Sequence, residues 1–209
     1  NGDFIEADAV ILALGYKPNS TLAENAGLQV SNKGFIKVDD YMRTEYADVF
    51  AVGDCAEKRD FITRKPNMVM LASTACAEAR IAGMNLYSLS AIKTFIGTIS
   101  IFSTALGETG FGVAGITVEL AKAENFNFVT GTFEGIDRHP GTLKDTHKQY
   151  VKLIVGKESG VILGGAVYGG LSAGELTNTI GIIVQNKMTL NSLLTAQIGT
   201  HPLLTASPA

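Results

Sequence analysis

The sequence predicts two consecutive fold classes, an α/β region over residues 1–92 and an α+β region with an antiparallel sheet over residues 93–209. Two observations predict the first: continuous apolar runs that end at glycine, and a long alanine-rich segment. Continuous apolar runs are typical of strands covered on both faces in a parallel sheet. Short runs separated by turns and followed by two helical segments predict the second.

Three strands and one helix are expected in the first region. Residues 9–14 (AVILAL) and 49–52 (VFAV) are wholly apolar, so each predicts a strand buried on both faces. Residues 35–38 (FIKV) alternate and indicate a more exposed strand. Residues 68–86 are rich in alanine and other helix formers. Their small side chains predict a helix packed closely against a sheet or a ligand.

Five strands are expected in the second region, together with three helices. A short helix is predicted over residues 117–123. Ser172 and Glu175 have the spacing of a capping box for the next helix. Thr189 is expected to cap the last helix, which runs to about Ala196. The expected strands are residues 95–106, 110–115, 126–133, 147–156 and 161–169.

The composition favours a globular protein, since 46% of the residues are hydrophobic and 18% are charged. A net charge of −3 gives no electrostatic reason to expect nucleic acid or an acidic membrane surface as a partner. No apolar stretch approaches the roughly 20 residues that span a bilayer. We therefore expect a cytoplasmic protein without a nucleic-acid or membrane partner.

The chain opens on Asn1-Gly2, the commonest two-residue hairpin turn, without an initiator methionine. It stops at Ala209 without a helix cap or a polar tail. These features predict a piece of a longer protein.

No metal site is predicted. The histidines share no metal-binding spacing with one another or with Cys55 and Cys76. Each cysteine lies among small apolar residues, which predicts a small buried hydrophobe.

The stretch TEYADVFAVGDCAE, residues 44–57, ends an apolar run in Gly53 and Asp54. Ligands of open parallel sheets bind at the carboxyl ends of the strands. Glycine there lets a ligand approach the backbone, and an aspartate can accept hydrogen bonds from hydroxyl groups. On these residues alone, Asp54 either holds a ligand or caps a turn or a helix.

The same stretch resembles the second flavin-binding motif of the pyridine nucleotide-disulfide oxidoreductase family, which reads Thr, six residues, Ala, any residue, Gly, Asp. ADAVILALGYKPNS is similar to the segment with which this family leaves its NADH-binding domain. MLASTACAEARIAGMNL resembles the helix whose first turn faces the flavin pyrimidine ring. Residues 93–209, including GTHPLLTASP, resemble the interface domain. The resemblance is strongest to the NADH oxidase and coenzyme A-disulfide reductase branch.

The resemblance implies a division of the chain. Residues 1–92 would hold the end of the NAD(P)H domain and the carboxyl-terminal part of a partial FAD-binding domain. Residues 93–209 would be the interface, or dimerisation, domain of a homodimer.

The resemblance also implies cofactor-binding residues. Asp54 would accept a hydrogen bond from the ribityl chain of FAD, and Gly53 would give the cofactor room. The backbone amides of Leu71, Ala72 and Ser73 would meet a flavin carbonyl oxygen. The positive end of the helix dipole would there stabilise negative charge on the reduced flavin. Without the resemblance, the residues favour simple core packing for this helix.

His201, followed by Pro202, is the catalytic candidate. In the family's disulfide reductases a His-Pro pair from one subunit acts as acid and base near the redox thiol of the other. Those enzymes place an orienting glutamate four positions after the proline, where this chain has Ala206. A structural or thiol-positioning role for His201 at the dimer interface is the alternative.

No Gly-x-Gly-x-x-Gly is expected after a strand anywhere in the chain, so neither dinucleotide diphosphate would have its usual cradle. The family's redox cysteine would likewise lie outside this chain. The resemblance implies an FAD-dependent parent enzyme that passes hydride from NADH or NADPH to FAD and on to oxygen, a peroxide or a disulfide. The fragment alone is expected to be inactive. The alternative is a non-catalytic homodimerisation module.

Overall fold

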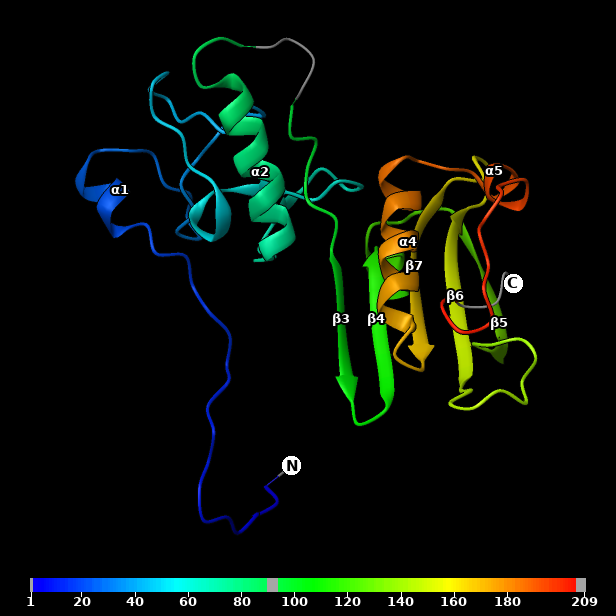
Figure 1. Cartoon of the computed structure of the whole chain (residues 1–209). Coiled ribbons are helices and arrows are strands. Elements are labelled where there is room, and N and C mark those ends of the chain that lie inside the picture. The colour runs from blue at the N-terminus through cyan, green and yellow to red at the C-terminus, as the bar shows by residue number, and fades with distance from the viewer. Residues whose placement is uncertain (1, 90–93, 206–209) are drawn as a thin grey trace. The chain divides into compact units, whose positions relative to one another are not determined.

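The computed structural model describes residues 2–89 and 94–205, which form two compact units. The first unit contains Asn1–Glu57 and Met70–Phe95, and the second contains Lys58–Val69 and Ile96–Ala209. Figure 1 labels their main elements. The expected domain boundary at residue 92 lies outside the described residues and stays a prediction.

The first unit contains two α-helices and one short 3₁₀ helix. They are α1 (Thr21–Asn25), η1 (Gly53–Cys55) and α2 (Ala72–Asn85). The expected alanine-rich helix is confirmed as α2, which begins four residues later than the apolar pattern does. A small core of Ala23, Ile36, Ala51 and Ala56 packs the loops between these helices.

The strands expected in the first unit are not formed among its described residues. Residues 9–14 have no strand partner there, and the exposed fractions of Ile11 and Leu14 are 92% and 90%. Within 35–38 and 49–52, isolated bridges stand in place of a ladder. An apolar run becomes a strand only when a neighbouring strand pairs with its backbone. Residues 9–14 have no such neighbour in the described part of this unit, and Ile36 and Phe50 have only isolated bridges, which is why the three strand predictions are wrong for it.

The second unit is built on a five-stranded antiparallel sheet, and all five expected strands are confirmed with shifted ends (Figure 1). Along the sheet the order is β3-β4-β7-β6-β5. A two-stranded hairpin of β1 (Lys58–Arg59) and β2 (Pro66–Asn67) belongs to the same unit. The strands of the large sheet are β3 (Ile101–Leu106), β4 (Thr109–Gly115), β5 (Phe128–Ile136), β6 (Lys148–Gly156) and β7 (Ile162–Gly169).

The helices of this unit are α3 (Val118–Ala123), α4 (Ala173–Gln185) and α5 (Leu190–Leu194). The cap at Thr189 is confirmed, because its hydroxyl oxygen accepts the N–H of Ser192 at 3.2 Å.

The predicted capping box at the start of α4 is wrong. Ser172 has helical backbone angles, φ −62° and ψ −15°, and makes no side-chain cap. A serine caps a helix from an extended backbone, which aims its oxygen at the free amides of the first turn. A helical backbone at this position removes that geometry.

Helix α4 packs on β3, β4 and β7. Ile180, Ile183 and Val184 of the helix share a core with residues of the sheet such as Val155 and Val167. This helix–sheet contact is the main core of the second unit.

Glycines of β4 let α4 approach the sheet. A Cβ on Gly110 would lie 3.2 Å from the Cβ of Ala173, and a Cβ on Gly112 would lie 2.8 Å from that of Thr177. The expectation that no Gly-x-Gly-x-x-Gly follows a strand is wrong, because residues 110–115 read GFGVAG and follow β3. They form a strand rather than a strand-to-helix turn, so these glycines make room for a helix and not for a phosphate.

We predict that Gly112→Ala lowers the free energy of unfolding by about 2 kcal/mol, because the new methyl group overpacks the contact with Thr177. Gly131→Ala in β5 is the matched control, since a Cβ there meets no atom within 4 Å. Urea unfolding of the two variants measures the difference. Equal stabilities would contradict the packing role of Gly112.

Candidate functional site

The candidate site begins where an extended backbone turns sharply at Gly53. Val52 is extended, with φ −139°, and Gly53 has φ +78°. Only glycine adopts that conformation readily. Gly53 and Asp54 open η1, and the Asp54 side chain is exposed. Asp54 makes no side-chain hydrogen bond within the described structure, so a capping role has no support there.

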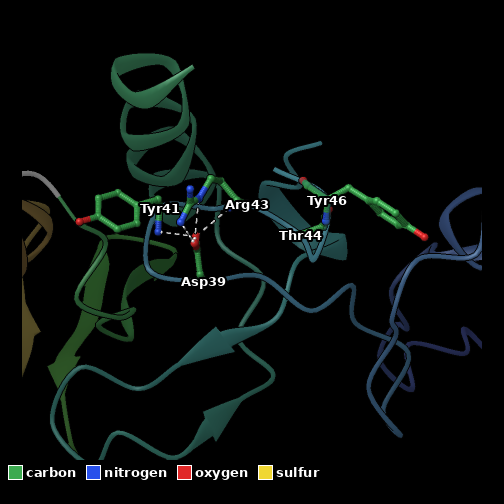
Figure 2. A network of polar contacts seen from close by, with 5 residues as sticks. All are labelled: Asp39, Tyr41, Arg43, Thr44 and Tyr46. Carbon is green, nitrogen blue, oxygen red and sulfur yellow. Dashed lines mark hydrogen bonds and ion pairs between the residues drawn. The ribbon is translucent and has the colours of Figure 1, made fainter. Parts of the chain in front are cut away.

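The threonine that begins the flavin-like motif closes the turn before this run (Figure 2). The Thr44 hydroxyl oxygen accepts the N–H of Tyr46 at 3.2 Å, and the Thr44 N–H donates to the Val49 carbonyl at 2.9 Å. Ala51, the next fixed position of the motif, donates its N–H to the Met42 carbonyl and lies in the core. Both residues therefore shape the backbone that carries Gly53.

A second turn, which the sequence analysis missed, is held by Asp39 (Figure 2). One carboxylate oxygen accepts the N–H groups of Tyr41 at 2.8 Å and Arg43 at 3.0 Å. The other accepts Nε and Nη2 of Arg43 at 2.9 and 2.6 Å. The Arg43 guanidinium lies 5.3 Å from the centre of the Tyr41 ring. An aspartate at the start of a turn accepts the N–H two residues on, and this is the signal that could have indicated the contact with Tyr41.

These contacts change the acidity of Asp39. Partial burial raises the pKa of this carboxyl group, but the hydrogen bonds from Arg43 and Tyr41 and the charge of Arg43 together hold the pKa below its ordinary value. The carboxylate form is thus the one that stabilises the turn.

Helix α2 also contacts the Gly53 turn. The Gly53 N–H donates to Oε2 of Glu78 at 2.6 Å, and the Glu78 side chain is fully buried, with an exposed fraction of 0%. A Cβ built on Gly53 would lie 3.6 Å from the Cβ of Ala75. No motif in the sequence selects Glu78. Its signal is that it is the lone acidic residue in the alanine-rich helix.

The first turn of α2 lacks a side-chain cap. Leu71 is the N-cap residue with an extended backbone, φ −131° and ψ 134°, and it makes no side-chain cap bond. Ala72 and Ser73 are exposed. The amides of a first helical turn have no partner within the helix, so an oxygen atom of a ligand can accept from them.

These features fit a flavin. An exposed carboxylate can accept from the hydroxyls of a polyol chain, and uncapped amides at a positive helix end suit a carbonyl oxygen. The carboxylate belongs to η1 and the uncapped amides belong to the start of α2, and these two helices contact each other. The assignment of Gly53, Asp54, Leu71, Ala72 and Ser73 to FAD stays a prediction.

His201 is exposed, and its described partners are backbone and hydroxyl groups. Its Nδ1 accepts the N–H of Leu203 at 3.1 Å, and its own N–H donates to the Thr205 hydroxyl at 3.0 Å. Ala206 lies outside the described residues. Within 94–205 no carboxylate orients His201, so an acid–base role remains a prediction.

A different histidine has a carboxylate partner. Nδ1 of His147 lies 3.3 Å from Oδ2 of buried Asp137, and the His147 N–H donates to Oδ1 at 2.7 Å. Register explains the pair, because the two residues extend the β5–β6 ladder by one position beyond Ile136 and Lys148.

The cysteines differ from each other. Cys55 is half-buried, and its thiol lies 3.6 Å from the Val52 carbonyl oxygen. Cys76 is exposed on α2, so the prediction of a buried residue is wrong there.

Among the described residues, no group of three or more histidine, cysteine or acidic side chains could hold a metal ion. None of their helices has the length and apolar character that crossing a membrane requires.

We predict that Asp39→Asn lowers the free energy of unfolding at pH 7 by about 0.5–1 kcal/mol, the range for a partly exposed ion pair. Because the folded-state pKa lies below the unfolded one, the wild-type advantage is present above about pH 4 and disappears as the pH falls through the folded value. Urea unfolding across this range measures it, with Asp40→Asn as the neighbouring control. A gap between wild type and Asp39→Asn that stays constant to low pH would contradict the prediction.

Comparisons with known proteins follow the two-part organisation. The model of the pyridine nucleotide-disulphide oxidoreductase family matches residues 1–79. The model of this family's dimerisation domain matches residues 101–208.

Individual relatives agree with this match. The NADH oxidase of Enterococcus faecalis is 30% identical over 200 residues, which cover 94% of this chain and 43% of the relative. The dihydrolipoyl dehydrogenase of Vibrio cholerae is 35% identical over 180 residues, which cover 85% of this chain and 35% of the relative. The structure of an NAD-dependent persulfide reductase from A. fulgidus superposes with a TM-score of 0.85 at 29% identity, covering 94% of this chain and 36% of that one.

This chain therefore spans less than half the length of each of these relatives. The match to the dimerisation-domain model alone covers more than half of the chain, and it confirms the resemblance expected from the sequence. The chain belongs to the pyridine nucleotide-disulphide oxidoreductase family.

Proposed function

We propose that this chain is part of an FAD-dependent NAD(P)H oxidoreductase that passes hydride from NAD(P)H to FAD and on to oxygen, a peroxide or a disulfide. The observation that carries the proposal is the Gly53–Asp54 turn, which presents an exposed carboxylate beside the helix whose first turn is uncapped. Family membership supports it. The relatives include enzymes named NADH oxidase, and a water-forming NADH oxidase from Lactobacillus brevis was solved with NADH bound.

Each residue has a separate task in this proposal. Asp54 accepts a hydrogen bond from a ribityl hydroxyl, which anchors the flavin. Gly53 lets the cofactor approach the backbone, because it carries no Cβ. When bound, FAD supplies a two-electron acceptor for hydride. The amides of Leu71, Ala72 and Ser73 stabilise negative charge at the flavin carbonyl, which favours hydride acceptance.

The second substrate is proposed only as a class. The names of the relatives include oxidases, dihydrolipoyl dehydrogenases and a persulfide reductase. These names refer to oxidation and to small sulfur compounds, namely a dihydrolipoyl group and a persulfide, so we propose a small-molecule, thiol or disulfide substrate. If the acceptor is a thiol species, His201 is the candidate to exchange a proton with it, since imidazole titrates near neutral pH.

We further propose that the parent protein is a cytoplasmic homodimer. The match to the dimerisation-domain model supports self-association. An aromatic row on the sheet supports it as well. Phe111 and Tyr168 alternate with residues that face α4, so they lie on the opposite face, where Tyr168 stacks on Tyr150 at 5.2 Å. Exposed rings of this kind stabilise an interface when they are buried.

The activity is tested on the full-length parent protein. We predict that the purified protein is yellow and that NADH or NADPH, added anaerobically, bleaches its absorbance near 450 nm, roughly where oxidised flavins absorb. Light scattering alongside the titration distinguishes the alternative. A dimer that takes up no FAD would overturn the proposed function and favour a non-catalytic homodimerisation module.

The role of Asp54 has its own test. We predict that Asp54→Ala in the parent protein weakens FAD binding roughly 10- to 100-fold, because a hydrogen bond to a charged acceptor contributes about 1.5–3 kcal/mol. Asp48→Ala, which removes an exposed acid from the preceding turn, is the control and should change the FAD Kd little. Titration of apoprotein with FAD, followed by flavin fluorescence, gives both constants. Equal Kd values for the two variants would remove Asp54 from the site.

A further inference from the structure

We infer that Glu78 is a positioning residue for the flavin site: its buried carboxylate fixes the Gly53–Asp54 turn against α2, so that Asp54 and the first turn of the helix keep one spacing. The inference rests on the proposed function. It assigns a role to a residue that neither the flavin motif nor the helix start contains.

The contact itself is specific. Glu78 Oε2 accepts the Gly53 N–H at 2.6 Å, across 25 positions of sequence. The Glu78 side chain is fully buried, so water does not compete for this hydrogen bond. A short bond from a backbone amide to a buried carboxyl oxygen restrains both groups strongly.

The turn geometry links this bond to Asp54. Gly53 has φ +78°, so the backbone changes direction at this residue. The N–H of the same residue donates to Glu78 of α2. The next side chain, Asp54, is exposed. A change in how Gly53 is held consequently changes the direction of Asp54.

The helix geometry links the same bond to the flavin-facing amides. Residues three, four and seven positions apart lie on one face of an α-helix, so Leu71, Ala75 and Glu78 share a face. Gly53 meets both Ala75 and Glu78 on this face. This face begins at Leu71, the N-cap residue, which precedes Glu78 by about 10 Å along the helix axis. Glu78 thus anchors the turn on the helix face that leads to the uncapped amides.

Burial of an acidic side chain in an alanine-rich helix has an unfavourable desolvation free energy, which an apolar residue of similar size avoids. The acceptor oxygen that binds the Gly53 N–H is the property to be tested. Glutamine retains such an oxygen, and methionine fills a similar volume without one. These two substitutions separate hydrogen bonding from packing.

The experiment uses the full-length parent protein and measures the Kd of FAD by fluorescence titration of the apoprotein. We expect E78M and E78A each to weaken FAD binding roughly tenfold, and E78Q to stay within about threefold of wild type. Arg80→Ala, an exposed position two residues further along α2, is the control and should also stay within about threefold.

A double-mutant cycle with Asp54→Ala shows whether Glu78 acts through Asp54. In the Asp54→Ala background, E78M should weaken FAD binding less than threefold, because the group that Glu78 positions is already gone. A merely structural role would give the full tenfold loss in both backgrounds.

Three outcomes would overturn the inference. They are an E78M affinity for FAD equal to that of the wild type, an E78Q affinity as low as that of E78M, or losses of FAD affinity that are additive in the double-mutant cycle. If E78A does not fold, the volume-conserving E78M still gives the decisive comparison. A wild-type parent that binds no FAD would instead contradict the proposed function, so the two failures are distinguishable.

Discussion

The hydrogen bond between the Gly53 amide and the buried carboxyl group of Glu78 is the interaction on which the candidate site depends. The first unit has no described sheet ladder, so its loops are held by single contacts rather than by repeated pairing. Thr44 and Asp39 close the turns that precede Gly53. Glu78 of α2 then accepts the hydrogen bond from the Gly53 N–H. The backbone reversal at a glycine and the burial of one acid together decide where the exposed carboxylate lies.

The second unit is organised by a different constraint, the close approach of α4 to the sheet. Glycines on β4 remove the side chains that would hold the helix away: Ala173 lies against Gly110, and Thr177 lies against Gly112. Because side chains alternate along a strand, the residues between these glycines point to the opposite face. Tight packing on one side of the sheet therefore places Phe111 and Tyr168 on the other, where Phe111 stacks with Tyr168 and Tyr168 stacks with Tyr150.

Sequence patterns predicted the second unit well because its strands pair with one another inside the chain, and the caps of its short helices follow local rules. They failed for residues 9–14, since an apolar run indicates that something covers it but not that the covering residues belong to the same segment. They failed at Ser172 because residue types do not fix backbone angles. Asp54 was selected through a family motif. Glu78 was not, because a lone acid in a helix usually indicates a solvent-facing position.

The exposed run AVILAL has a consequence for handling this chain. It combines β-branched and other apolar residues with no charge and no proline, and its backbone amides have no described ladder partner. Segments of that composition add readily to the edges of other chains and seed cross-β aggregates. In this polypeptide prepared by itself, the segment would therefore promote aggregation. A strand that pairs with the segment would be needed to keep the polypeptide in solution.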